Sequence, residues 1–136
     1  MSKAEQKKSN FKILAIDDSN ISLSFISDSL LSAGYTTLEQ TSNPKEGLQL
    51  IQNLDFHLYI IDLVMPDLSG IELAKEIVRG EQNSCILMIS SLDSENVLIE
   101  SIANGARDFL PKPFRKADLI SSVDKLYEYA IKERIF

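Results

Sequence analysis

Three short, nearly continuous apolar runs constrain the fold of this chain more than any other feature. They are FKILAI at 11–16, HLYII at 57–61 and CILMI at 85–89. A strand with one face in water alternates apolar and polar residues, so runs without alternation indicate strands buried on both faces. Such strands are typical of parallel sheets, because helical crossovers cover both faces of a parallel sheet. The runs therefore predict a parallel sheet enclosed by helices.

Helical patterns separate these runs from one another and from two weaker strand candidates, at 35–40 and 107–111. The pattern over 20–33 carries an apolar stripe made of Ile21, Phe25, Ile26, Leu30 and Ala33. Asn43-Pro44 and Ser69-Gly70 are typical helix starts, the second opening a helix over about 70–79, and Asp93 is a candidate cap for the next helix. The last helix carries Leu119, Val123, Leu126, Tyr127 and Ala130 with a period of 3.6 residues.

A strand followed by a helix thus occurs five times in order. This alternation predicts a doubly wound α/β domain with a five-stranded parallel sheet and five helices. The domain is expected over residues 11–132. Residues 1–10 are polar and have no apolar period, so a disordered tail is expected there, and residues 133–136 form the C-terminal end.

Composition and charge narrow the class of protein. The 136 residues suit one domain, and the net charge of -6 argues against a nucleic-acid-binding surface, which needs basic patches. No apolar run approaches the roughly 18 residues of a membrane helix, and the first ten residues lack the apolar core of a signal peptide. The single cysteine, Cys85, cannot form an intrachain disulfide. These features predict a cytoplasmic protein.

Polar side chains stand where the predicted strands end. They are Asp17, Asp18, Asp62, Ser90 and Lys112. The carboxyl ends of parallel strands meet at one edge of the sheet, so these side chains are expected to lie together. Three carboxylates can hold a divalent cation, and a hydroxyl and an ammonium can bind phosphoryl oxygens. The set therefore points to phosphoryl chemistry on an aspartate.

Each residue also has a structural interpretation when it is taken alone. Asp-Asp-Ser occurs in solvated turns that cap helices, and Asp62 could be a turn residue. Ser90 could be a polar strand end and Lys112 a surface charge. The structural interpretation is weakened because all five residues follow apolar runs of the same predicted sheet.

Four segments in order resemble one known family. They are IDDS (16–19), DLVMPDLSG (62–70), MISS (88–91) and GARDFLPKPF (105–114). On a fivefold strand–helix pattern they resemble the CheY-like receiver domains of two-component response regulators, over about residues 10–132. The resemblance implies a flavodoxin-like sheet with the strand order 2-1-3-4-5.

The resemblance also implies roles for particular residues. Asp62 would be the phosphoacceptor, and Mg²⁺ would be bound by Asp17, Asp18, Asp62 and the main-chain carbonyl of Val64. Ser90 and Lys112 would bind the phosphoryl group, and the Lys112-Pro113 bond would be cis. Phe109 would be the aromatic switch residue that turns inward with Ser90.

A receiver domain is a phosphorylated switch and not an enzyme that turns over a substrate. Its donor would be a sensor histidine kinase or a histidine phosphotransfer protein. Its output would be an unknown partner or a C-terminal output domain absent from this chain, reached through the fourth helix, fifth strand and fifth helix. No binding to nucleic acid or membrane is expected of this domain, and phosphorylation could produce a dimer.

His57 is the only histidine, and its position argues against an internal phosphodonor. It precedes Asp62 by five residues, about 16 Å along an extended strand. Other functions stay open as alternatives: a phosphatase using Asp62 as nucleophile, a docking module that is never phosphorylated, and a flavin-binding protein. A phosphatase usually has a second acid two residues after the nucleophile, where this chain has Val64, and Asp17-Asp18 would repel a flavin phosphate.

Overall fold

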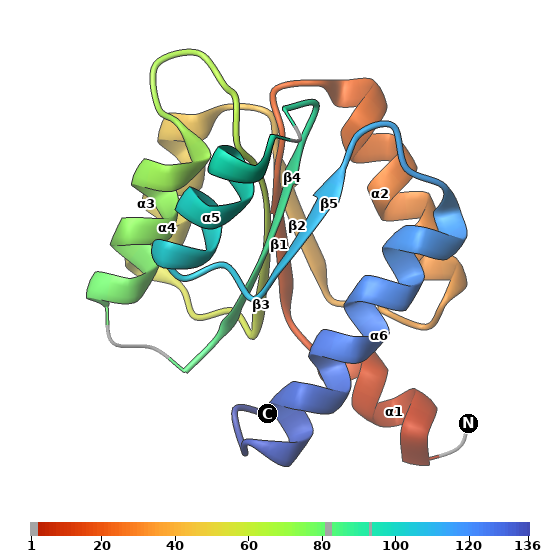
Figure 1. Cartoon of the computed structure of the whole chain (residues 1–136). Helices are drawn as coiled ribbons and strands as arrows, with labels where there is room; N and C mark the ends of the chain where they lie inside the picture. Colours follow the sequence, from red (N-terminus) through yellow and green to blue (C-terminus); the bar gives the residue numbers. More distant parts are fainter. Residues whose placement is uncertain (1–2, 81–82, 93) are drawn as a thin grey trace.

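The computed structural model describes residues 3–80, 83–92 and 94–136. Within them a five-stranded parallel sheet lies between two layers of helices (Figure 1), in the order β2-β1-β3-β4-β5. The strands are β1 (Ile13–Ile16), β2 (Leu38–Thr41), β3 (Leu58–Asp62), β4 (Cys85–Ser90) and β5 (Asp108–Pro111). The helices are α1 (Lys3–Asn10), α2 (Asn20–Ser32), α3 (Pro44–Asn53), α4 (Gly70–Arg79), α5 (Glu95–Ala103) and α6 (Lys116–Lys132). The predicted fold class and strand order are confirmed.

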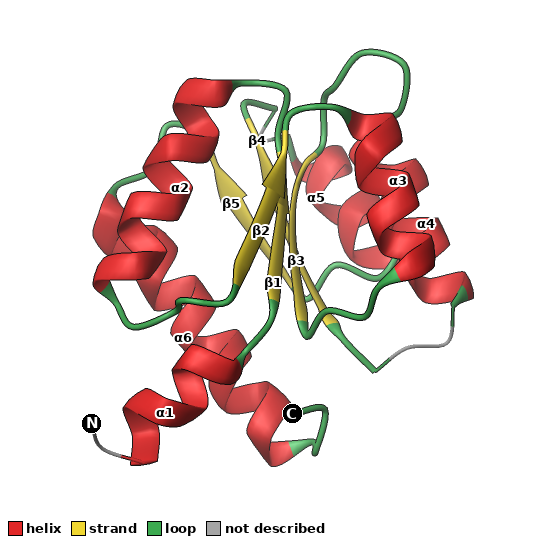
Figure 2. Ribbon diagram, turned by 180° about the vertical axis from the view of Figure 1, so that it is seen from behind, coloured by secondary structure: helices red, strands yellow, loops and turns green. Residues whose placement is uncertain are grey.

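The central strands are buried on both faces, as their continuous apolar runs predict. All residues of β1, β3 and β4 are buried. Ile13 and Ala15 belong to a core shared with α2 and α6, whereas Leu14 and Ile16 belong to a second core against α3 and α4. The two cores lie on opposite sides of the sheet, with α2 and α6 on one side and α3, α4 and α5 on the other (Figures 1 and 2).

Two of the three predicted helix starts are confirmed by their capping hydrogen bonds. The Asn43 side chain accepts from the backbone N–H groups of Lys45 and Glu46 before α3. The Ser69 side chain accepts from the N–H of Glu72 before α4. At α5 the cap is Ser94 rather than Asp93, which lies outside the described residues.

Within the segment expected to be a disordered tail the structure shows a helix, so the expected number of helices is also corrected. Lys3–Asn10 form α1, so the described residues contain six helices and not five. The Lys8 ammonium lies 3.4 Å from a carboxylate oxygen of Asp124 on α6 and above the ring of Tyr35. The hydroxyl of Thr37 donates to the carbonyl of Ser9. A polar segment without an apolar period thus docks through polar contacts, which a search for apolar patterns does not detect.

The predicted apolar stripe of α2 is wrong at two positions. Ile21 is 85% exposed and Phe25 is 40% exposed, whereas Leu23 is buried. Ile21 lies in the first turn of α2, and Phe25 lies one turn further along, where its ring stacks on that of Phe114. None of the described helices is long and apolar enough to cross a lipid bilayer.

Strand register brings the polar strand ends to one level. Ile16 pairs with Ile61, so the next residues, Asp17 and Asp62, follow at the same height. On the other side of β3, Asp62 pairs with Ile89, immediately before Ser90. Ser90 pairs with Pro111, immediately before Lys112. The carboxyl edge of the sheet therefore carries every polar residue that the sequence singles out there.

Gly70 permits α4 to start unusually close to the end of β3. A Cβ at this position would lie 2.6 Å from the carbonyl oxygen of Asp62 and 2.8 Å from the Cα of Leu63. The N–H of Gly70 donates to the carbonyl of Leu63 across 2.9 Å. The backbone thus returns closely on itself after β3, with the start of α4 packed against the end of the strand.

Candidate functional site

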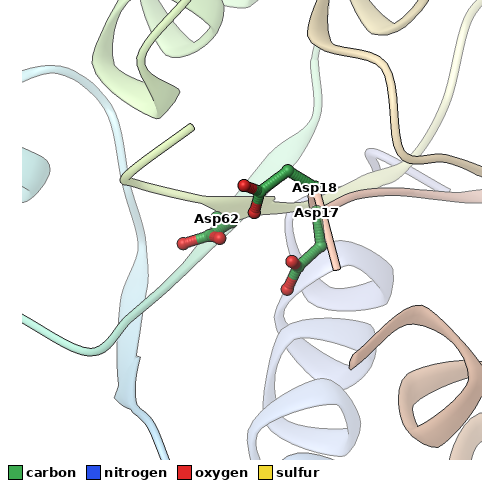
Figure 3. Close-up of side chains that lie close together, drawn as sticks. All are labelled: Asp17, Asp18 and Asp62. Carbon is green, nitrogen blue, oxygen red and sulfur yellow. The ribbon is translucent and has the colours of Figure 1, made fainter. Parts of the chain in front are cut away.

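Three carboxylates form a compact cluster at the ends of β1 and β3. One oxygen from each of Asp17, Asp18 and Asp62 lies within 4.8 Å of the other two. Figure 3 shows the three side chains lying close together. Asp17 and Asp62 are buried, whereas Asp18 is exposed. Two acids of the cluster are thus buried, and the third faces solvent.

Each buried carboxylate uses its two oxygens differently. One oxygen is held by its own loop: Asp17 Oδ1 accepts from the Ser19 N–H at 2.9 Å, and Asp62 Oδ1 accepts from the Val64 N–H at 3.3 Å. The other oxygen faces Lys112, whose Nζ lies 2.7 Å from Asp17 Oδ2 and 3.4 Å from Asp62 Oδ2. Lys112 therefore bridges the two acids.

Burial and mutual repulsion govern the protonation of this cluster. Burial, followed by the negative charge of Asp17, raises the pKa of Asp62 to about 6, although Lys112 partly offsets both effects. Burial alone would lower the pKa of Lys112. The hydrogen bond to Asp17 and the charges of Asp62 and Asp17 outweigh burial, so the pKa of Lys112 is raised. The site therefore holds a firmly charged ammonium between acids that repel each other.

The donor set fits a hard divalent cation. Magnesium prefers a few carboxylate oxygens and retains waters or phosphate oxygens in its remaining positions. Burial, followed by the charge of Asp17, raises the pKa of Asp62, so a cation beside this carboxylate would favour its charged form. Asp18 is exposed, so one acid of the cluster is in contact with solvent.

The remaining predicted residues surround the acids. Ser90 is fully buried, and its Oγ accepts from the N–H of Leu92 at 3.0 Å. The carbonyl of Ser90 accepts from the N–H of Lys112 at 2.7 Å, and the Lys112-Pro113 bond is cis, as the resemblance implies. Phe109 is half-buried at the border of the core against α3 and α4, and Val64 follows Asp62 in the exposed part of the loop.

His57 lies at the opposite edge of the sheet from the acids. It immediately precedes β3, whereas Asp62 ends that strand. Its Nδ1 accepts from the N–H of Lys12 at 2.9 Å, and its ring stacks on Phe11. Burial, assisted by the charge of Lys12, lowers the pKa of His57. These contacts support its interpretation as a structural residue.

An apolar groove beside the acids was not identified from the sequence. It has a volume of about 520 Å³, includes Lys112 in its wall, and is otherwise lined by Ser19, Ile21, Ser22, Phe25, Ser91, Pro113 and Phe114. The rings of Phe25 and Phe114 stack with centroids 5.8 Å apart. The signal in the sequence was Ile21 and Phe25, which an ordinary amphipathic interpretation of α2 assigns to the core.

The parallel sheet and its acidic edge define the class: a doubly wound α/β protein with a cluster of acids at the carboxyl ends of its strands. Residues 13–124 match the family model of the response regulator receiver domain. The chain therefore belongs to the receiver domains of response regulators, and the predicted resemblance is confirmed.

Curated proteins and solved structures agree with this assignment. The chemotaxis protein CheY of Thermotoga maritima is 28% identical, over 85% of this chain and 96% of that protein. The receiver domain of the Francisella response regulator 1452 is 33% identical, with a TM-score of 0.79 over 89% of this chain and 99% of that chain. A CheY-like receiver domain from Methanospirillum hungatei has a TM-score of 0.83, 27% identity, and coverage of 90% and 97%. Helix α1 precedes the residues that match the family model.

Proposed function

We propose that this receiver domain is a signalling switch in which Asp62 accepts a phosphoryl group from a phosphohistidine of a partner protein. The observation that carries the proposal is the position of Asp62. It is buried, lies within 4.8 Å of two further carboxylates, and has its Oδ2 3.4 Å from the Lys112 ammonium. A carboxylate in such a setting is a nucleophile with a cationic partner ready for the incoming phosphoryl oxygens.

Magnesium is the proposed cofactor. Asp17, Asp18 and Asp62, together with the main-chain carbonyl of Val64, would hold it. When bound, Mg²⁺ offsets the negative charge of the carboxylates and coordinates a phosphoryl oxygen. The clustered acids support this assignment, because hard oxygen donors suit Mg²⁺.

Transfer requires that Asp62 be ionised. Its pKa of about 6 leaves the carboxylate mostly deprotonated at neutral pH and more basic than an exposed aspartate. An Asp62 oxygen forms a bond to phosphorus while the bond from phosphorus to the imidazole nitrogen breaks, and its electron pair stays on that nitrogen. The Lys112 ammonium, already 3.4 Å from Asp62 Oδ2, binds an oxygen of the transferred group.

Ser90 is the proposed reader of the phosphoryl group. Its Oγ already accepts from the N–H of Leu92. A hydroxyl has one hydrogen to donate, which stays available for a phosphoryl oxygen. Movement of Ser90 toward Asp62 would displace the loop that carries Leu92, and Phe109 would turn inward. Phosphorylation would favour one of two pre-existing conformations.

The apolar groove of Ile21, Phe25, Pro113 and Phe114 is the proposed docking site of the phosphodonor. Lys112 lines the groove and also lies 2.7 Å from Asp17 and 3.4 Å from Asp62, so a protein seated there would lie close to Asp62. Its exposed apolar side chains suit the apolar face of a helix. A sensor histidine kinase or a histidine phosphotransfer protein is the expected occupant.

The other functional assignments follow from the receiver class. The domain acts as a switch rather than as a turnover enzyme, in the cytoplasm. Its output is expected through α5, β5 and α6, toward a partner protein or an output domain, with phosphorylation-dependent dimerisation as one outcome. We expect no binding of nucleic acid by this domain, because the net charge is -6.

Labelling with a small phosphodonor tests the proposal. Incubation with acetyl phosphate and magnesium should add one base-labile phosphoryl group, located at Asp62 by mass spectrometry. Asp62→Asn should take up none, because an amide is a poor nucleophile. Asp67→Asn is the matched control: Asp67 lies in the same loop but is exposed, so labelling should persist. Equal labelling of Asp62→Asn and the wild type would overturn the assignment.

A further inference from the structure

Helix α5 is attached to the domain by very few buried side chains. Ser101 is its only buried residue, and its hydroxyl donates to the carbonyl of Val97 within the same helix. Its large apolar side chains Leu98, Ile99 and Ile102 are 37%, 57% and 54% exposed. Most of the hydrophobic surface of this helix therefore faces solvent.

Ile102 forms one wall of a groove between the C-terminal ends of α4 and α5. The opposite wall is Val78, which is 56% exposed, and the groove has a volume of about 430 Å³. Gly105 lets the two helices approach here: it has a φ of +108°, and a Cβ on it would lie 2.8 Å from Val78 Cγ2. The residues that line the groove come from the C-terminal parts of α4 and α5 and the turn after α5, and not from β5 or α6.

The charge at this groove is opposite to that of the chain as a whole. The net charge is -6, yet the charged side chains that line the groove are Lys75 and Arg79. Arg79 is paired with Glu76 at 2.5 Å. Lys75 is exposed and has no ion pair among the described residues. An apolar groove with an unpaired cation at its rim suits a partner segment that is apolar on one face and acidic on the other.

The two walls of the groove differ in how firmly they are held. α4 buries Ile71, Leu73, Ala74 and Ile77 and starts against the backbone of Asp62 and Leu63. α5 buries only Ser101 and follows the loop after Ser90, the last residue of β4. The Oγ of Ser90 holds the N–H of Leu92, two residues before the Ser94 cap. A displacement of Ser90 would therefore move α5 relative to α4.

We propose that the groove between α4 and α5, lined by Val78, Ile102 and Lys75, binds an acidic amphipathic segment of a partner protein, and that phosphorylation of Asp62 changes its affinity. The gating rests on the function proposed above for Asp62 and Ser90. The proposal that the groove binds a partner does not depend on that function, because it rests on the exposed apolar side chains and the unpaired lysine. This groove would be a third partner surface, beside the groove proposed for the phosphodonor and the output face expected on α5, β5 and α6.

A pair of designed peptides tests the chemistry of the groove. One is a helical peptide with leucines on one face and glutamates on the other, and the second has lysines in place of the glutamates. Fluorescence anisotropy should show the acidic peptide binding at least about tenfold tighter. Amide shifts in the NMR spectrum should map to residues 75–79 and 98–105. Loading with beryllofluoride and magnesium should change the affinity of the acidic peptide at least about threefold.

Substitutions in the groove test whether the acidic peptide binds there. Ile102→Ser and Val78→Ser should each weaken the acidic peptide by about fivefold or more, because they remove apolar contacts. Lys75→Glu should reverse the preference between the peptides. Leu31→Ser removes a similarly exposed apolar side chain, 47% exposed on α2, and should leave binding unchanged. All these variants change exposed positions, so circular dichroism should show the wild-type fold.

Several outcomes would overturn the inference. Equal binding of the two peptides, an unchanged preference in Lys75→Glu, or amide shifts confined to β5 and α6 would each do so. A concentration-dependent dimer that Ile102→Ser abolishes would identify a second copy of this chain as the occupant instead. Acetyl phosphate labelling of the same samples separates the two proposals. Labelled Asp62 with no change in peptide affinity refutes the gating alone, whereas absence of labelling refutes the function proposed for Asp62.

Discussion

At the scale of single residues, the burial of the Asp62 carboxylate suits phosphoryl transfer but lowers the stability of the folded protein. Its carboxylate is buried beside Asp17, which raises its pKa from the ordinary 3.8 to about 6. A raised carboxyl pKa means that the folded state binds the proton more tightly than the unfolded chain does. The stabilisation from protonating Asp62 is therefore present at low pH and is lost as pH rises through about 6.

We accordingly expect Asp62→Asn to stabilise the protein at pH 7 in the absence of divalent cations, by about 1–3 kcal/mol. The amide has no charge to bury, and Lys112 keeps its contact with Asp17. Chemical denaturation at pH 4 and pH 7 measures the effect, and the difference between the proteins should shrink toward pH 4. Asp67→Asn, at an exposed acid, serves as the control. A gain that is the same at both pH values would argue against a raised pKa of Asp62.

At the scale of elements, the start of α4 determines where the end of β3 lies. Ser69, which caps the helix, and Gly70, which follows it, have different structural roles. Ser69 satisfies the N–H of Glu72, whereas Gly70 leaves room for the backbone of Asp62 and Leu63. A change at Gly70 should therefore reach the site, and a change at Ser69 should affect the helix alone.

Gly70→Ala should destabilise the protein by about 1–3 kcal/mol, because its Cβ meets backbone atoms that cannot rotate away. It should also slow acetyl phosphate labelling, since the displaced backbone is that of Asp62. Ser69→Ala should cost about 1 kcal/mol through the lost cap and leave the labelling rate near that of the wild type. Thermal unfolding and a labelling time course measure both effects. If the two variants slowed labelling equally, the close approach at Gly70 would have no special role.

At the scale of the whole molecule, two strands brought together by the fold create the charge cluster, so a cation that binds it should stabilise the domain. Magnesium that binds the folded state and not the unfolded chain raises stability by mass action. We expect the melting temperature to rise with MgCl₂, and Asp18→Asn to need at least about tenfold more Mg²⁺ for the same rise. Sodium chloride at matched ionic strength controls for screening. Equal magnesium dependence of wild type and Asp18→Asn would remove Asp18 from the proposed metal site.

Local patterns were sufficient for much of the fold and for the acidic cluster. Continuous apolar runs identified β1, β3 and β4, because strands buried on both faces are apolar along nearly their whole length and become polar only at their carboxyl ends. Parallel pairing then makes their ends meet, which is why Asp17 and Asp62 could be placed together in advance. The caps at Asn43 and Ser69 are equally local, since side chain and backbone lie within three residues.

Other features depend on contacts between distant segments, and only the tertiary structure decided them. Helix α1 docks through Lys8 onto Asp124, and an isolated polar segment carries no sign of such a distant partner. Ile21 and Phe25 line a groove together with Pro113 and Phe114, which come from a distant part of the chain, and are not buried in the core. The residues of the sequence thus determined the strands, their order of occurrence and the chemistry at their ends. Which apolar side chains stay exposed for partners was decided by packing, since burial depends on neighbours that arrive from elsewhere in the chain.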